Sequence, residues 1–420
     1  MKAGTFNGGL AFQAKGMGKG SFEAVPAPSR IIIPLKQDSA KPCSASVKKG
    51  ASIKKGDIIG ESELSAVHAP VSGKVIEVKK RFPHPSGEFV SAIDIESDGK
   101  QAATEEVIES LDPLELAQKN GLTDMQGAGL PLKQKIEEAR KHSVQSIVIN
   151  AIDEEPWFSS RTLCLYEQAL DLDKGVQILK ELLDVSNVYI ASYEQAPSNL
   201  PASAGQVVTL PPRHPQSLPE LIAKAVLGRE IPSERSAEAV GTSIFDVETI
   251  CALARTMENS QPLLERYISV WGASWAAPRN FRVPIGTRIG DLLKSCGVKL
   301  QDVGKVVSGG PLMGQALQNF DLPVTKETRG IFFEKKEEVV DLTQEGCIKC
   351  GDCVEVCPMG LMPFLLSGFS EAEQLSMTEK YDIFSCVECG CCAYICPVRI
   401  PLVQWIQFGK ASLRAQEGKE

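Results

Sequence analysis

The pattern of apolar and polar positions changes character along the chain, and each change marks a predicted module. After residue 30 the apolar positions fall in short β-type segments, beginning with three isoleucines at 31–33. The motifs V-K-K-G and I-K-K-G recur at 47–50 and 53–56, where each glycine gives a turn access to positive φ. The sequence A-P-V-S-G-K-V at 69–75 is typical of a hairpin. Residues 1–103 are therefore predicted to form a compact β-module.

An alternation of strand and helix patterns follows over residues 104–265. The continuous apolar run at 144–149 is typical of a strand that is buried on both faces of a parallel sheet, and 188–191 predicts a second strand. Helical patterns of apolar positions lie at 104–120, 133–141 and 162–184. This order of strand, loop and helix indicates a Rossmann-like α/β domain.

The chain becomes rich in β-type segments again over residues 266–335. Strand patterns lie at 268–270, 281–287, 306–307 and 331–333, with a short helix expected at 289–296. This combination predicts a β-grasp-like module of the SLBB type. A charged linker then leads into residues 336–420, which predict a small helical domain with a last helix at 402–413.

The C-terminal domain contains one cysteine pattern twice, C-x2-C-x2-C-x3-C-P, with the spacing of bacterial two-cluster ferredoxins. Three thiolates of each motif lie on a tight loop, and the fourth, expected at the start of a helix, reaches the neighbouring cluster. We predict that one [4Fe–4S] cluster is held by the first cysteine set, which is Cys347, Cys350, Cys353 and Cys396. The other [4Fe–4S] cluster is expected on the second cysteine set, which is Cys386, Cys389, Cys392 and Cys357.

Composition argues against other interpretations of these cysteines. A pair of zinc sites would normally space its ligand pairs further apart, and a disulfide framework is typical of a small secreted domain rather than a 420-residue chain. Cys391 lies off the motif spacing and is interpreted as a spare thiol. The remaining cysteines are expected to be small buried side chains, and they are Cys43, Cys164, Cys251 and Cys296.

Charge and hydropathy limit which partners and which cellular compartment the sequence allows. The net charge of −8, without a basic stripe, argues against a nucleic-acid partner. The N-terminus has no apolar core of signal-peptide length, and no window approaches 18 consecutive apolar residues, so no membrane span is expected. Unpaired cysteines and oxygen-sensitive clusters then point to the reducing cytoplasm.

Two features of the α/β domain suggest a ligand. Gly127, Ala128 and Gly129 open onto a helix, where free amide N–H groups and the positive end of the helix dipole suit a phosphate. The acidic run at 153–155 follows a predicted strand, at the edge where α/β sheets bind ligands. Either feature alone is more often an ordinary turn or a solvated loop, and together they leave a nucleotide or flavin site as an open hypothesis.

The order of these parts closely resembles the RnfC family, the peripheral, NADH-side subunit of the Rnf ion-translocating electron-transport complex. The resemblance covers nearly the whole chain. Its motifs are R-I-I-I-P-L at 30–35, H-P-S-G at 84–87, I-N-x4-E-P at 149–156, S-G-G-P-x-M-G at 308–314 and the two cysteine motifs. The N-terminal module also resembles the lipoyl- and biotinyl-type barrel-sandwich fold. The α/β domain is similar to the flavoprotein subunit of respiratory complex I, which binds FMN and NADH.

The resemblance implies a set of cofactor-binding residues and a route for electrons. It places FMN and NADH near Gly127, Ala128, Gly129, Lys135, Asn150, Asp153 and Glu155. NADH is then the electron donor, FMN splits the electron pair, and the two clusters pass single electrons to a ferredoxin-like subunit. The implied assembly is an ion-translocating NADH:ferredoxin-type oxidoreductase complex. The implied location is peripheral, on the cytoplasmic side of the inner membrane and without a span of its own.

The glycine loop departs from the family pattern, which opens a second interpretation. Asp124, Met125 and Gln126 stand where the family has mostly glycine, and each adds a side chain where the backbone would approach a phosphate or flavin. The alternative is therefore an RnfC-like relay that has lost flavin and NADH binding and connects partner proteins through its clusters alone. A soluble flavo-iron–sulfur reductase is disfavoured, because that related family has its parts in a different order.

Overall fold

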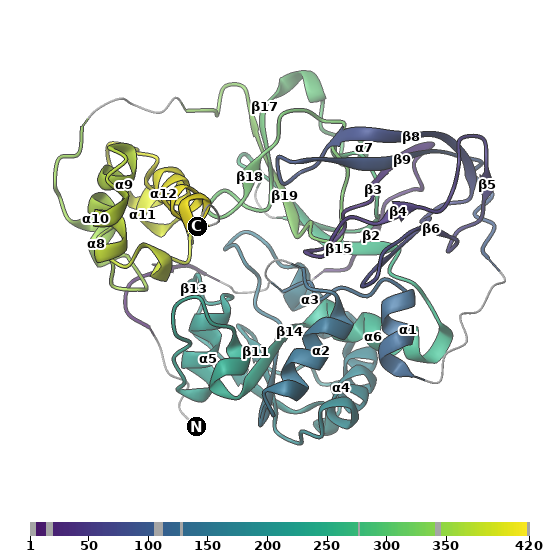
Figure 1. The fold of residues 1–420 in the computed structure, drawn as a ribbon, viewed down its shortest axis with the longest axis horizontal. Helices are drawn as coiled ribbons and strands as arrows, with labels where there is room; N and C mark the ends of the chain where they lie inside the picture. The colour runs from purple at the N-terminus through teal and green to yellow at the C-terminus, as the bar shows by residue number, and fades with distance from the viewer. Residues whose placement is uncertain are drawn as a thin grey trace.

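β-rich, α/β and helical parts follow one another along the chain, as the apolar pattern predicts (Figure 1). The computed structural model describes residues 6–13, 20–104, 112–126, 129–275, 278–340 and 346–417. In Figure 1 the β-rich modules lie together at the upper right, the α/β domain lies below them, and the C-terminal helices gather at the left. The predicted multidomain α/β and β class is confirmed.

The N-terminal module is a sandwich of two antiparallel sheets, with strand orders β3-β9-β8-β5 and β4-β6-β7. Its strands are β3 (Arg30–Pro34), β4 (Ser44–Ala45), β5 (Ser52–Ile53), β6 (Ile58–Glu61), β7 (Ala66–His68), β8 (Gly73–Pro83) and β9 (Phe89–Ser97). Ile31 and Ile33 face the core of the sandwich, whereas Ile32 packs into the core of the β-grasp-like module. Strand β3 is buried on both faces, which explains its unbroken run of isoleucine.

The α/β domain has a parallel sheet of order β12-β11-β10-β14 with helices on both faces. The strands are β10 (Ser146–Asn150), β11 (Val188–Ser192), β12 (Gln206–Thr209) and β14 (Thr242–Asp246). The helices are α1 (Pro113–Lys119), α2 (Leu132–Lys141), α3 (Ser160–Glu167), α4 (Ala169–Leu183), α5 (Pro219–Leu227) and α6 (Val247–Asn259). Ile147 and Ile149 pack with α2, α4 and α6, and Val148 packs on the α5 side.

One helix prediction in this domain is wrong, and another can be compared with the structure only in part. The single helix expected at 162–184 is wrong, because the chain leaves helical geometry at Gln168 (φ −114°, ψ 27°) and forms α3 and α4 instead. Of the helix expected at 104–120, the described part is α1, which Asp112 caps by accepting from the N–H of Leu114 at 2.9 Å. Residues 105–111 lie outside the described residues.

The β-grasp-like module has three antiparallel strand pairs among the described residues, with its helix after the first pair and its first and last long strands paired in parallel. Its elements are β15 (Glu265–Gly272), β16 (Arg279–Pro284), α7 (Ile289–Ser295), β17 (Val303–Ser308), β18 (Gln315–Ala316) and β19 (Gly330–Lys335). Strand β2 (Glu23–Ala24) extends this sheet by pairing in parallel with β16. The N-terminal lead-in therefore contributes a strand to a module that begins more than two hundred residues later.

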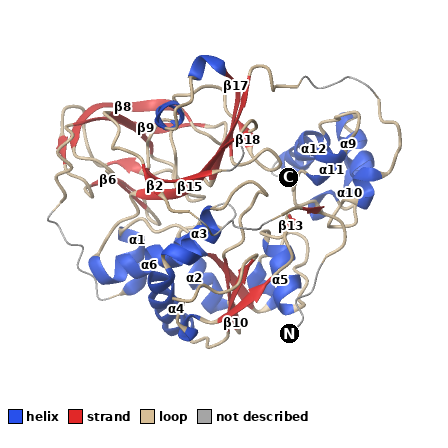
Figure 2. Cartoon of the chain, turned by 180° about the vertical axis from the view of Figure 1, so that it is seen from behind, coloured by secondary structure: helices blue, strands red, loops and turns tan. Residues whose placement is uncertain are grey.

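The C-terminal domain is built from short helices around the cysteine motifs. They are α8 (Asp352–Glu355), α9 (Pro363–Glu371), α10 (Leu375–Lys380), α11 (Cys391–Ile395) and α12 (Leu402–Glu417). Figure 2 shows these helices beside β13 (Arg213–His214), which pairs with β1 (Leu10–Ala11). Within the described residues, no helix combines the length and apolar character that a membrane span requires.

Candidate electron-transfer site

The two cysteine sets surround two separate cavities. The first cavity, of about 220 Å³, is lined by Cys347, Cys350, Cys353 and Cys396, together with apolar side chains that include Phe364 and Leu402. The second and smaller cavity is lined by Cys357, Cys386, Cys389 and Cys392, together with Cys391. Each predicted set therefore comes together, including the fourth cysteine from the other motif. Among the described residues, no three His, Cys, Asp or Glu side chains converge as ligands of a single ion.

The two cysteine loops share one backbone geometry. Lys349 and Glu388, each placed just before the second cysteine of its motif, have φ of +58° and +54°. Their backbone N–H groups approach the Sγ atoms of Cys347 and Cys386 at 3.4 and 3.5 Å. Such N–H groups around the sulfurs help to set the potential of an iron–sulfur cluster. The soft thiol donors and these amides fit a [4Fe–4S] cluster at each cavity.

One detail of the cysteine prediction is wrong. Cys357 and Cys396 follow the short helices α8 and α11 rather than beginning helices. Gly351 and Gly390, at φ +91° and +80°, precede those helices and turn the chain inward after the second cysteine. A helix of one turn then supplies the spacing that carries the fourth cysteine to the other cavity.

The two cavities differ in exposure. Cys347 and Cys350 of the first set are exposed, whereas Cys389 and Cys392 of the second set are buried. Burial raises the pKa of Cys386 to about 11, so its free thiol is protonated at neutral pH. Iron binding at the second set would therefore release protons. The first set is therefore the more exposed of the two, although its Cys353 is buried.

The glycine loop is only partly described. Gly127 and Ala128 lie outside the described residues, and Gly129 adopts φ +68°, which glycine tolerates best. Lys135 does not reach outward from helix α2. Its ammonium group is buried, pairs with the Asp124 carboxylate at 2.5 Å and also donates to the carbonyl of Ile244. Asp124, which stands where the resemblance implies a glycine, is thus the partner of this lysine.

Asn150 and Asp153 occupy the carboxyl edge of the sheet, as expected. The Asn150 side-chain amide donates to Gln126 Oε1 at 2.6 Å and to the Ser217 carbonyl at 3.0 Å. The Asp153 carboxylate accepts from the backbone N–H of Arg161 at 2.8 Å and from the Thr162 hydroxyl at 2.6 Å. Burial raises the pKa of Asp153 to about 6. Both side chains are bonded to the protein itself.

Glu155 reaches away from the α/β domain into the loop at 308–314 of the β-grasp-like module. Its carboxylate accepts from the backbone N–H groups of Leu312 at 3.2 Å and Met313 at 2.7 Å. Burial raises the pKa of Glu155 to about 8, against the opposing effect of these N–H groups. The expected acidic run is thus a buried junction rather than a solvated loop.

The polar groups near the ends of β10 and β14 fit a polar cofactor in one respect. Of the described side chains that the resemblance assigns to FMN, those of Lys135, Asn150 and Asp153 are hydrogen-bonded within the chain near the ends of β10 and β14. Beside them, the Ser217 hydroxyl is buried and has no hydrogen-bond partner among the described residues. The Ser217 carbonyl accepts from Asn150. The hydroxyl of the same residue is the buried polar group that lacks a partner among the described residues.

A junction that sequence reasoning missed connects the α/β domain to the second cysteine set. The His214 ring is buried, with Nδ1 2.9 Å from the Glu154 carbonyl oxygen and Nε2 2.7 Å from the Cys389 carbonyl oxygen. Gly390 packs so closely against Leu312 that an added Cβ would lie 2.3 Å from its carbonyl oxygen. A lone histidine carries no spacing signal, although the loop motif at 308–314 marked one side of the junction.

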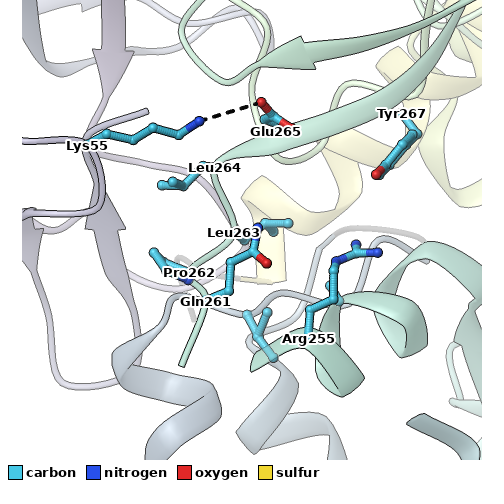
Figure 3. Close-up of a pocket in the computed structure, with 10 residues that line it drawn as sticks. Lys55, Arg255, Gln261, Pro262, Leu263, Leu264, Glu265 and Tyr267 are labelled. Carbon is cyan, nitrogen blue, oxygen red and sulfur yellow. Dashed lines mark ion pairs between the residues drawn. The ribbon is translucent and has the colours of Figure 1, made fainter. Parts of the chain in front are cut away.

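A further cavity, of about 60 Å³, lies away from these residues (Figure 3). It is lined by segment 261–265, Arg255 and Tyr267, and Lys55 approaches Glu265 across it at 3.9 Å. Arg255 is already bonded to Gln168 and Asp171. None of the predicted site residues lines this cavity.

Comparison with known proteins identifies the family. Residues 4–100 match the RnfC barrel sandwich hybrid domain, 117–255 match the Nuo51 FMN-binding domain, and 335–400 match the 4Fe-4S dicluster domain. A similar protein belongs to the proton-translocating ferredoxin:NAD(+) oxidoreductase complex of Clostridium ljungdahlii, and it is 33% identical over 95% of this chain and 91% of its own length. The chain belongs to the RnfC family. Its barrel-sandwich and two-cluster domains are those expected from the sequence.

Other RnfC relatives are longer. The corresponding protein of the ion-translocating oxidoreductase complex of Yersinia pestis is 32% identical, and the alignment covers 93% of this chain and 66% of that protein. Its counterpart in Serratia proteamaculans is also 32% identical, with 94% of this chain and 59% of that protein covered. The crystal structure of an air-oxidized NAD+-reducing [NiFe]-hydrogenase aligns with 72% of this chain and 66% of that one at a TM-score of 0.49 and 16% identity.

The domain matches establish which cofactor-binding domains this RnfC chain contains. It is an electron-transfer protein with a 4Fe-4S dicluster domain and an FMN-binding domain of the Nuo51 type. The FMN-binding match favours the interpretation with flavin over that of a relay without it. Its relatives are subunits of multi-subunit ion-translocating complexes.

Proposed function

We propose that this chain transfers electrons between NADH and ferredoxin-linked partner subunits of an Rnf-type membrane complex. The observation that carries the proposal is the exchange of fourth cysteines, which gives each cavity four thiols from two motifs. Cys347, Cys350, Cys353 and Cys396 would hold one cluster, and Cys386, Cys389, Cys392 and Cys357 the other. Bound FMN would supply the change from two-electron to one-electron chemistry.

Hydrogen bonds within the chain arrange the backbone at the cysteine loops and at the proposed flavin site. Backbone N–H groups of Lys349 and Glu388 would donate toward cluster sulfurs. Lys135, Asn150 and Asp153 would hold the chain in place beside the proposed flavin site, since their polar atoms are hydrogen-bonded within the chain. The framework thus fixes backbone positions beside the glycine loop, and preorganised backbone is what a phosphate or flavin requires.

The partner subunit is expected at the first cysteine set. Ile348 lies between the exposed Cys347 and Cys350 and is 60% exposed. Tyr394 and Ile395 directly precede Cys396 of the same set in the chain, and they are 60% and 39% exposed. Apolar side chains around an exposed cofactor site suit an electron-transfer partner, which must approach the cluster closely. We also propose a peripheral position on the cytoplasmic side of the membrane. Association with a membrane complex is supported by the relatives, which are subunits of ion-translocating complexes.

The test is anaerobic reconstitution of the full chain with iron, sulfide and FMN, followed by analysis of iron, flavin and NADH-dependent bleaching. The proposal predicts about eight iron atoms per chain, from two four-iron clusters, and one FMN. NADH should then bleach the cluster absorbance. Iron uptake without flavin would instead support the relay. A chain that takes up neither iron nor flavin would contradict both.

A further inference from the structure

The second cysteine set is attached to the α/β domain through His214. The His214 side chain is 1% exposed, and its two ring nitrogens lie within hydrogen-bond distance of the Glu154 and Cys389 carbonyl oxygens. Glu154 belongs to the acidic segment that follows β10, and Cys389 is one of the four thiols of the second cavity. One buried ring therefore spans the space between the flavin-binding domain and a cluster loop.

Contacts around His214 hold the same loop and the fourth cysteine of the set. The Cys391 thiol donates to the His214 carbonyl at 3.8 Å. Strand β1 pairs with β13 on one side, and the N–H of Gly9 donates to the carbonyl of Val356 at 2.7 Å on the other. Val356 precedes Cys357, so the N-terminal segment connects His214 to the cysteine that the first motif lends to the second cavity.

A second connection runs through the loop at 308–314. Glu155 accepts from the N–H groups of Leu312 and Met313, and the Leu312 carbonyl oxygen packs against Gly390. Gly390 follows Cys389 directly. The acidic segment thus reaches both sides of Cys389, once through the His214 ring and once through Leu312.

We propose that His214 is a positioning residue that fixes the second cluster against the FMN-binding domain and tunes that cluster selectively. The inference rests on the proposed function in that it requires both cysteine sets to bind clusters. Groups bonded to the residues that ligate a metal orient the ligands and affect the potential. Cys347 and Cys350 are exposed, and the hydrogen bonds of His214 reach Cys389 and Cys391 near the second cavity, so we expect removal of His214 to leave the first set unchanged.

The test compares His214→Ala and His214→Gln with His142→Ala in the reconstituted full chain. His142 is a suitable control because its ring is partly exposed and its nearest carboxylate is that of Glu138 at 3.2 Å. Iron content is measured first, and the midpoint potential and electron paramagnetic resonance spectrum of each cluster are then recorded. Cys350→Ser and Cys386→Ser assign the signals to the first and second sets.

For His214→Ala we expect a change confined to the second cluster. Its reduction equilibrium constant should change about tenfold, which is about 59 mV for one electron, and its spectrum should change with it. The Gln side-chain amide can still donate an N–H to one of the two carbonyl oxygens and should restore part of the shift, and His142→Ala should match wild type. If His214→Ala takes up no iron, the same comparison is made with His214→Gln.

Two results would overturn the inference. Wild-type potentials for both clusters in both His214 variants would remove the positioning role, and equal shifts of both clusters would remove its selectivity. A wild-type chain without clusters would instead contradict the proposed function. The two failures are therefore distinguishable in the same set of measurements.

Discussion

Glu155 and Met313 are joined by a hydrogen bond of 2.7 Å that connects the α/β domain to the β-grasp-like module. The Glu155 carboxyl is buried, and burial raises its pKa to about 8. In the unfolded chain its pKa returns to about 4.5. The native state therefore binds more protons than the unfolded state between these two values, and stability contributed by this carboxyl falls as pH rises through that window.

Glu155→Gln should remove this pH dependence. Gln keeps an oxygen that accepts from Met313 but does not ionise, so the unfolding midpoint of the variant should fall less than that of wild type between pH 5 and pH 8. Urea unfolding of the metal-free chain at intervals across this range measures the difference. Glu61→Gln, at an exposed position, is the control and should follow wild type. Parallel curves for Glu155→Gln and wild type would show that Glu155 does not titrate in this window.

Lys135→Met should destabilise the chain strongly. The ammonium group pairs with buried Asp124, whose own pKa is raised by burial, so loss of the lysine leaves an uncompensated carboxylate in the interior. Breaking one partner of a buried pair costs about 3–5 kcal/mol. Urea unfolding should show this loss, and the double variant with Asp124→Asn should recover part of it.

The matched control for this pair is Lys141→Met on the same helix. Lys141 is exposed and lies 3.7 Å from Glu138, and exposed pairs of this kind contribute at most about 1 kcal/mol. Equal losses in the two lysine variants would contradict the assignment of Lys135 to the framework. Flavin content measured on folded Lys135→Met would show in addition whether that framework supports FMN.

The strands and the cysteine sets could be predicted because each has a strong local signal. Ile147, Val148 and Ile149 are apolar without interruption since both faces of β10 are covered by helices. The cysteine spacing is dictated by cluster geometry, so the exchange of Cys357 and Cys396 between motifs could be predicted before any fold was known. Those sets are the ones that line the two cavities.

Long-range polar contacts were not predictable in the same way. Strands β1, β2 and β13 have two residues each, which is too short for any periodic pattern. The break at Gln168 involves neither glycine nor proline, so the helix pattern ran through it. Likewise Asp124 resembled a lost glycine, and only its place beside Lys135 shows that it balances a buried charge.

Gly310→Ala should disturb the junction between the two modules. A Cβ at residue 310 would lie 2.1 Å from Cγ of Glu155, so the acidic side chain or the loop must move. Overpacking of this kind typically costs about 1–3 kcal/mol. The unfolding midpoint should fall accordingly. Gly368→Ala in α9, where an added Cβ meets no atom within 4 Å, should instead be stabilising by up to about 1 kcal/mol. A fall in both variants would mean that crowding at Glu155 is not the cause.

Iron content should distinguish the neighbouring cysteines 391 and 392. Both line the second cavity, but Cys391 lies off the motif spacing and its buried thiol donates to the His214 carbonyl. We expect Cys391→Ser to retain about eight iron atoms per chain and Cys392→Ser to retain about four, because only the second change removes a ligand of a four-iron cluster. Anaerobic reconstitution followed by iron and sulfide analysis provides the count. The opposite pattern, with iron lost from Cys391→Ser and kept by Cys392→Ser, would transfer the ligand role to Cys391 and change the composition of the second cysteine set.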